Sequence, residues 1–254
     1  MSPNLIRHTF LPAILVIACA SAAATSTPFQ PTFHLSAFSH PLRIDNPWSP
    51  FQTGTRYVFH EFEDGECKTN EVLVTQQSKR DFHGIYAGLA ARSVIDRVWS
   101  DPTCEGKRAL LLEDTVDWYA QDDRGSVWYV GERTVQYAYD DAGHRVGSDT
   151  AGSWEAGRDG ARAGYAMPAH PFAGFFYRQE FLAGEAEDQA RVLDVGIRAW
   201  TALGRFHDCV RTRDTSPLSP GDVEFKTYCR NFGLVRVVAP AVGGGAELVT
   251  VSRQ

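Results

Sequence analysis

The stretch Asp117-Trp118-Tyr119-Ala120-Gln121-Asp122-Asp123-Arg124-Gly125-Ser126-Val127-Trp128-Tyr129-Val130-Gly131-Glu132 decides the fold class. Large apolar residues alternate with small or polar ones on both sides of a polar centre, with the period of two that is typical of β-strands. The central Asp-Asp-Arg-Gly consists of turn formers, and its glycine can adopt a positive φ. We predict a β-hairpin in which Trp118 faces Tyr129 and Tyr119 faces Trp128 across the two strands.

The same alternation recurs along the chain from residue 55 onward. Turn-forming residues such as Gly, Pro, Asp and Asn separate the alternating stretches. We predict strands over residues 55–62, 67–76, 84–89, 91–99, 108–119, 127–139, 147–155, 175–182, 190–199, 231–238 and 246–252, with a further hairpin across residues 209–229.

Helical periodicity is confined to one brief stretch, residues 185–192. Most connections are short and polar, which is typical of an antiparallel meander. Residues 157–171 are rich in Gly, Ala and Pro and are predicted to form a long loop, of the kind that often carries function. We predict an all-β fold in which a strongly curved antiparallel meander sheet forms a half-closed barrel. The alternative is a two-sheet sandwich.

The beginning of the chain predicts export. Residues 1–24 contain one arginine, a short apolar run and then small residues, which is typical of a secretory signal peptide. The apolar run is too short to cross a bilayer as a helix. Cys19 ends a lipobox-like sequence, so an acylated cysteine is the alternative to simple cleavage. Residues 25–45 are predicted to be a flexible tether, and residues 46–254 a single all-β domain.

Four cysteines follow Cys19, an even number that predicts two disulfides in an oxidising compartment. Cys209 and Cys229 flank a hairpin-like stretch that would bring them opposite each other. We therefore predict the pairs Cys209–Cys229 and Cys67–Cys104. The spacing contains no C-x₂₋₄-C pattern, which argues against a cysteine metal site and against redox catalysis.

The net charge of −6 is mildly acidic, and no run of Lys or Arg appears in the sequence. Nucleic-acid partners are therefore not expected. Contact with a membrane is expected only through a lipid anchor at Cys19. Together with the export signal, these features predict a periplasmic protein, an outer-membrane lipoprotein or an extracellular protein.

Several motifs resemble those of a family of exported bacterial proteins. They are Asn46-Pro47-Trp48, DWYAQDxxGxVWYxGE at 117–132, SWEAGxDGA at 153–161, MPAxP at 167–171 and YRQE at 177–180. This resemblance implies export and carries over no catalytic or binding residue. A looser likeness, in residues 224–228 and 232–235, is to envelope lipoproteins with a curved sheet, including lipoprotein carriers, and concerns the fold alone.

Carboxylates close to aromatic residues suggest one kind of chemistry. Two carboxyl groups on facing strands suit glycoside hydrolysis, because burial can keep one protonated while the other stays ionised. Glu155 and Glu180 are the candidate pair for a secreted hydrolase of this type. The structural interpretation is that these acids cap turns, form ion pairs or face water.

The acidic turn after residue 183 supplies Glu185, Glu187 and Asp188, which are candidate ligands for a hard cation such as Ca²⁺. The turn lacks the regular spacing of a known calcium loop, so a solvated acidic turn is the other interpretation. No other cofactor is expected.

Aromatic residues give the first choice of function. Most belong in the core, but those on the concave side of a curved sheet could line a cavity. The candidate binding residues are Trp118, Tyr119, Trp128, Tyr129 and Trp154, with Arg178 and Glu180 as a polar handle. We therefore expect a non-enzymatic envelope protein that binds an apolar or aromatic small molecule, a lipid or a protein partner.

Overall fold

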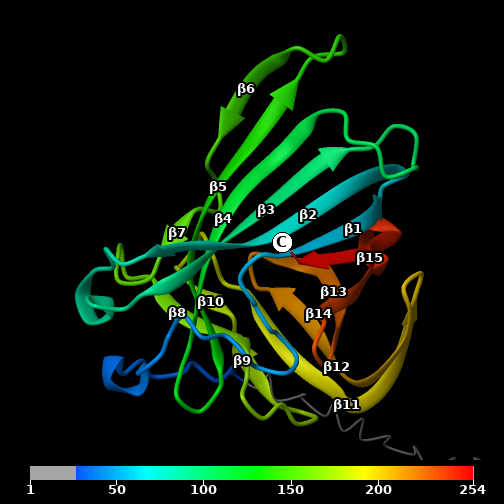
Figure 1. The fold of residues 1–254 in the computed structure, drawn as a ribbon. Helices are drawn as coiled ribbons and strands as arrows, with labels where there is room; N and C mark the ends of the chain where they lie inside the picture. The colour runs from blue at the N-terminus through cyan, green and yellow to red at the C-terminus, as the bar shows by residue number, and fades with distance from the viewer. Residues whose placement is uncertain (1–26, 254) are drawn as a thin grey trace, which may run out of the picture.

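The computed structural model describes residues 27–253, which contain strands and three short 3₁₀ turns but no α-helix. Figure 1 shows the strands wrapped around a common interior. The strands are β1 (Thr55–Glu63), β2 (Glu66–Lys79), β3 (Ala91–Ser100), β4 (Leu111–Gln121), β5 (Val127–Tyr139), β6 (Arg145–Asp149), β7 (Trp154–Glu155), β8 (Arg162–Met167), β9 (Phe176–Arg178), β10 (Glu180–Phe181), β11 (Gln189–Thr201), β12 (Gly204–Ser216), β13 (Ser219–Cys229), β14 (Gly233–Ala239) and β15 (Gly244–Arg253).

These strands form one antiparallel sheet, in the order β10-β8-β5-β4-β3-β2-β1-β15-β14-β13-β12-β11-β9, with β6 and β7 also paired to β5. The sheet curves into a barrel that is closed except at one seam. The two strands at the ends of this order, β9 and β10, are separated in sequence only by Gln179, so the chain itself crosses the seam. The predicted all-β curved sheet is confirmed, and the sandwich alternative is wrong.

The seam is also bridged by the beginning of the described chain. The amide of Phe29 donates to the carbonyl of Phe176 in β9 at 2.8 Å, and the amide of Arg178 donates to the carbonyl of Phe29 at 3.0 Å. The side chain of Gln30 donates to the carbonyl of Ala163 in β8 at 2.9 Å. Residues 29 and 30 therefore join β9 to β8.

Residues 27–45 are not the exposed tether that the sequence predicted. Phe33, Phe38 and Ile44 are buried, with exposed fractions of 6%, 7% and 3%. The ring of Phe33 lies 4.3 Å from that of Tyr86 and meets Trp128 edge-on at 5.8 Å. The apolar residues of this segment do not alternate with polar ones as in a strand. Each instead packs at its own place on the barrel wall. The predicted signal peptide and Cys19 lie outside the described residues.

The central hairpin forms as predicted, but its register differs by one residue. Tyr119 pairs with Tyr129 and Ala120 with Trp128, while Trp118 pairs with Gly131 across a β-bulge. The rings of Tyr119 and Tyr129 stack at 4.9 Å. The turn is held by the buried side chain of Asp122, which accepts hydrogen bonds from the backbone amides of residues 124 and 126 and from the Trp128 indole.

Two other sequence predictions need correction. Residues 84–89 are not a strand: a 3₁₀ turn, η2 (Gly84–Tyr86), carries the buried Tyr86 and is followed by the buried Leu89. The predicted loop 157–171 contains the strand β8. Its small residues do not show the alternation of apolar and polar residues that indicates a strand, but they permit close packing. Gly164 in β8 shows why, because an added Cβ would lie 2.3 Å from the carbonyl oxygen of Arg178.

Both predicted disulfides are confirmed. Cys67 at the start of β2 pairs with Cys104 in the turn after β3, and Cys209 pairs with Cys229 across β12 and β13. Two disulfides are typical of a protein exported to an oxidising compartment. Between residues 27 and 253, no helix is long and apolar enough to cross a membrane.

Candidate binding cavity

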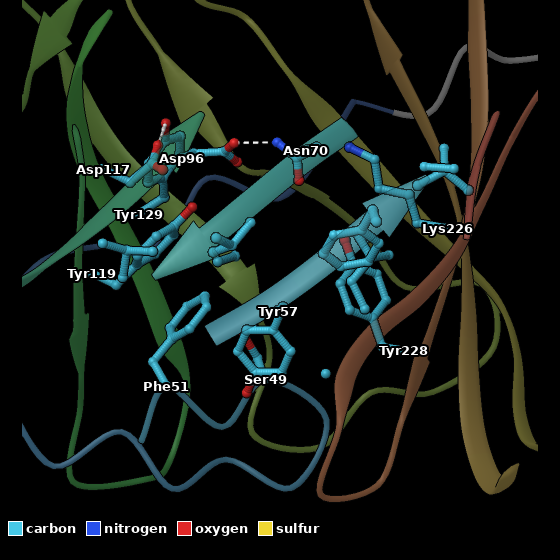
Figure 2. Close-up of a pocket in the computed structure, with 18 of the residues that line it drawn as sticks. Ser49, Phe51, Tyr57, Asn70, Asp96, Asp117, Tyr119, Tyr129, Lys226 and Tyr228 are labelled. Atoms are coloured by element: carbon cyan, nitrogen blue, oxygen red, sulfur yellow. Dashed lines mark hydrogen bonds between the residues drawn. The ribbon is translucent and has the colours of Figure 1, made fainter. Parts of the chain in front are cut away.

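A partly open cavity of about 450 Å³ lies within the barrel. Figure 2 shows Phe51 and Ser49 towards one end of it and Asn70, Asp96 and Lys226 towards the other. Strands from both halves of the chain contribute, so residues far apart in sequence face each other across the interior. The lining residues are Ser49, Pro50, Phe51, Tyr57, Phe59, Glu61, Asn70, Val72, Val94, Asp96, Asp117, Tyr119, Tyr129, Glu132, Ala166, Gln179, Glu180, Asp188, Lys226, Tyr228, Phe232, Gly233, Leu234, Val237 and Ala246.

Strand β1 shows how the sequence arranges this lining. Alternate side chains of a strand point to the same face, so Tyr57, Phe59 and Glu61 all enter the cavity. Along β1 the lining therefore changes from aromatic to acidic. Phe51 and Tyr119, whose rings lie 4.5 Å apart, extend the aromatic part beside Tyr57. We call this part the aromatic layer.

The acidic part contains six carboxylates, which we call the carboxylate layer. They come from different strands and from the loop before β11: Glu61, Asp96, Asp117, Glu132, Glu180 and Asp188. Internal hydrogen bonds hold several of them. The hydroxyl of Tyr129 donates to Oδ1 of Asp117 at 2.7 Å, the Thr134 hydroxyl donates to Oε2 of Glu132 at 3.0 Å, and the Asn70 amide donates to Asp96.

Glu132 enters the cavity because of the bulge in β5. Tyr129 already faces inward, so strict alternation would direct residue 131 inward and residue 132 outward. The bulge at Gly131 changes this parity, and both Tyr129 and Glu132 line the cavity. Gly131 has φ +141, and an added Cβ would lie 2.6 Å from the carbonyl oxygen of Trp154. The position therefore requires glycine.

Burial strongly perturbs the acids of the carboxylate layer. It raises the pKa of Glu61, Asp96 and Glu132 to about 7 each, against the usual range near 4. Burial also raises the pKa of Glu180 to about 8, with the carboxylates of Asp188 and Glu132 adding repulsion. The pKa of Asp117 is raised well above its usual value by burial and by the nearby Asp96. The free protein therefore holds several of these acids as neutral groups near neutral pH.

Lys226 is the only Lys, Arg or His among the cavity-lining residues of the described chain. Its ammonium group already has two partners, Asp214 at 3.4 Å and Glu224 at 3.0 Å. These acids raise the pKa of Lys226 although burial opposes its charge, so the side chain is a fixed cation. Lys226 forms no ion pair with the six carboxylates in the described chain, although its charge acts on Asp188 and opposes the rise of that pKa.

A second hollow of about 470 Å³ adjoins the cavity and shares Asp188 and Lys226 with it. We call it the mouth. It is lined by turns at the ends of β1, β12 and β14, and it adds five acids, Glu63, Glu185, Asp214, Asp222 and Glu224. Asp214 is only 5% exposed, and its Oδ1 has no hydrogen-bond partner among the described residues. The mouth therefore places further acids beside the cavity, next to Lys226.

The predicted binding residues are divided between two environments. Tyr119 and Tyr129 line the cavity, as predicted for the concave side. Trp118 and Trp128 lie outside the cavity lining: Trp118 lies below the ammonium of Lys79, 4.9 Å away, and Trp128 packs against the N-terminal segment. Trp154 is buried at 5.3 Å from the Tyr129 ring and does not line the cavity. The guanidinium of Arg178 stacks over Phe181 at 4.3 Å, also outside the lining.

Glu155 and Glu180 do not share a cavity. Glu180 is buried in the carboxylate layer, whereas Glu155 forms ion pairs with Lys79 at 3.2 Å and Arg158 at 2.8 Å and lies within hydrogen-bond distance of His83 at 3.1 Å. These partners lower the pKa of Glu155 even though burial opposes its charge. Glu155 is therefore an ionised group in a surface network.

The acidic turn forms no grouped metal site. The Glu187 side chain accepts a hydrogen bond from the Gly184 amide at 3.0 Å, Glu185 is exposed at the mouth, and Asp188 reaches the cavity. In residues 27–253, no three His, Cys, Asp or Glu side chains are placed so that they could hold a metal ion.

Sequence reasoning missed Glu61, Asp96, Tyr57, Tyr228 and Lys226 as site residues. A signal existed for part of this set, because Tyr57 and Glu61 share one parity within a strand that was correctly predicted. The parity that faces inward was not evident, since both faces of β1 carry mixed residues. No sequence signal indicates that β13 lies opposite β4.

Comparisons with known proteins add little to this geometry. No protein-family model matches the chain, and no curated protein sequence matches it. Among solved structures, the fold is similar to the crystal structure of a "putative lipoprotein" from Parabacteroides distasonis, with 11% sequence identity and a TM-score of 0.37. The match covers 82% of this chain and 99% of the other. At this distance the likeness carries no inference about function.

Proposed function

We propose that this protein is an exported, non-enzymatic binding protein that holds a small molecule inside its barrel. The observation that carries the proposal is the cavity of about 450 Å³, lined by aromatic and aliphatic side chains and by polar and acidic ones. Ligand sites in proteins typically have volumes of roughly 300–1,000 Å³ and combine apolar walls with polar groups that orient the ligand.

The aromatic layer would bind the apolar or aromatic part of the ligand. Tyr119 and Tyr129 stack on each other, and Phe51 packs against Tyr119, so these rings form a wall. Burial of apolar ligand surface against such a wall contributes about 25 cal/mol per Å². Because rigid strands carry most of these side chains, little conformational entropy is lost on binding.

The disulfides support export, and the lipid anchor at Cys19 stays part of the proposal. The cavity favours a small molecule, with or without a lipid-like tail, over a protein partner, since its walls are inside the barrel. Hydrolysis by Glu155 and Glu180 is not proposed, because Glu155 belongs to the surface network with Lys79 and Arg158.

Native mass spectrometry of the protein purified from its own cell envelope tests this function. We expect a non-covalent adduct that is absent from the denatured spectrum. Val72 lines the cavity, and Val72→Trp would fill it; Val146 in β6 is 65% exposed, so Val146→Trp adds the same ring outside. The adduct should be lost from Val72→Trp and retained by Val146→Trp.

Circular dichroism and thermal unfolding establish that Val72→Trp is folded before its spectrum is compared. Loss of the adduct from a folded Val72→Trp protein supports the cavity as the site. An adduct retained equally by both variants would place the ligand elsewhere, and a wild-type protein without any adduct would contradict the proposed function.

A further inference from the structure

We propose that the ligand is a cation, namely an organic amine whose protonated nitrogen lies in the carboxylate layer and whose apolar body lies in the aromatic layer. This inference rests on the proposed function and names the ligand class. It follows from the charges that the cavity leaves uncompensated, from an orphaned acceptor at the mouth, and from the order of the two layers along the barrel.

The first observation is the imbalance of charge. The cavity lining holds six carboxylates and one lysine, and that lysine is already paired with Asp214 and Glu224. No ion pair joins any of the six to a basic residue in the described chain, although ion pairs are frequent on the outer surface, such as Arg97–Asp114 and Arg211–Asp194. Glu180, which is only 7% exposed, is the most enclosed example together with Asp117.

The second observation concerns Asp214, which lies at the mouth outside the carboxylate layer and whose Oδ2 is paired with Lys226 at 3.4 Å. Oδ1 of Asp214 is buried at the mouth without a hydrogen-bond partner among the described residues, and the side chain is itself only 5% exposed. Buried polar atoms are normally satisfied, so an orphaned acceptor indicates a missing donor. An ammonium group carries several donors and no acceptor, which suits a lining that contains six carboxyl groups.

The arrangement fits an organic cation better than a metal ion. A hard metal ion requires several oxygen ligands at about 2.0–2.6 Å around one point, and no group of three acidic, His or Cys side chains in residues 27–253 provides this. The carboxylates instead come from six positions around the cavity, which Tyr57, Tyr119 and Tyr129 also line. Aromatic faces and carboxylates together favour an ammonium group attached to an apolar body.

The mouth adjoins the cavity and adds acids next to it. Its five additional acids extend the negative lining outward from Asp188. Channels lined by one sign of charge raise the local concentration of ions of the opposite sign and repel ions of the same sign. An amine would therefore enter readily, whereas an anion with the same body would be excluded.

Isothermal titration calorimetry at about pH 8 with three matched probes tests this inference. Tryptamine, tryptophol and indoleacetate share one aromatic body but carry an ammonium, a hydroxyl and a carboxylate group. We expect tryptamine to bind at least about tenfold more tightly than tryptophol and indoleacetate not to bind, since a hydrogen bond to a charged group is worth about a factor of ten.

Glu180→Gln and Glu66→Gln are the matched variants, because Glu66 is exposed at the first position of β2 and does not line the cavity. Glu180→Gln should weaken tryptamine about tenfold and leave tryptophol unchanged, and Glu66→Gln should change neither. Equal binding of tryptamine and tryptophol, or an equal effect of both variants, would overturn the cation assignment, as would an absence of tryptamine binding. The proposed function is tested separately by the native adduct and its loss from Val72→Trp.

Discussion

Glu180 is the residue at which burial and charge oppose each other most clearly. It is 7% exposed, it lies in the carboxylate layer, and burial raises its pKa to about 8, with Asp188 and Glu132 adding negative charge. Ionisation of this group is unfavourable in the free protein, because no cation is paired with it. A bound cation would pair with the ionised carboxylate and remove the free-energy cost of its ionisation. The burial of Glu180 therefore favours the binding of an amine.

A dependence of stability on pH follows from these carboxyl groups. Glu180, with a pKa of about 8, and Glu61, Asp96 and Glu132, with pKa values of about 7, keep their protons in the folded protein. The unfolded chain loses these protons near pH 4, so the folded state binds more protons between about pH 5 and pH 8. The free energy of unfolding should therefore fall as pH rises through this range, as measured by urea unfolding without ligand.

The variant Glu180→Gln isolates the contribution of one group. It should flatten the pH dependence and raise the free energy of unfolding at pH 8 by at least about 1 kcal/mol, because one unit of pKa corresponds to about 1.4 kcal/mol. The exposed Glu66→Gln serves as the control and should leave the slope unchanged. A wild-type stability that rises between pH 5 and pH 8 would contradict this account.

At the scale of an element, β5 shows what alternation predicts and what it does not. The pattern of residues 127–132 correctly indicates a strand, and the preceding turn forms around Asp122. The pattern gives the wrong partners for Tyr119 and Trp128 because the turn is one residue longer than predicted, so that Gln121 pairs with Val127. The bulge at Gly131 then displaces the partner of Trp118 by one more residue. A bulge depends on close packing against β7, which a local pattern of residue types does not contain.

Gly131→Ala should therefore disturb β5 and the cavity together. The added Cβ would lie 2.6 Å from the Trp154 carbonyl oxygen, at a φ of +141 that a side chain rarely adopts. We expect a loss of roughly 1–3 kcal/mol in the free energy of unfolding and a weaker ligand complex, since Glu132 loses its position. Gly221→Ala, where nothing lies within 4 Å, is the control for urea unfolding. Equal stability of the two variants would show that the bulge is not required.

At the scale of the whole molecule, the seam determines whether the cavity is enclosed. Only short strands, β9 and β10, meet there, and Phe29 and Gln30 add hydrogen bonds across it. The close approach of β8 to the backbone near Arg178 requires Gly164. Barrel closure therefore depends on the residues that the sequence suggested were a tether and a loop.

Gly164→Ala tests this closure. Its Cβ would lie 2.3 Å from the Arg178 carbonyl oxygen, so the seam must open or shift. We expect faster amide hydrogen exchange in β9 and β10 and a loss of stability of about 1–3 kcal/mol. Gly147→Ala in β6, where the nearest atom would be 3.9 Å away, should leave exchange at the seam unchanged. Unchanged exchange in Gly164→Ala would contradict a role for the seam.

The sequence by itself determined the strand content, the central turn and both disulfides, because alternation, turn formers and cysteine positions are local or nearly local properties. It also identified Tyr119, Tyr129 and Glu180 as candidates. Only the tertiary structure decided which strand face points inward, how the seam closes, and that acids from distant strands share one cavity. These features depend on bulges and on contacts between residues far apart in the chain. The alternation of residues along a strand predicts neither the bulges nor these contacts.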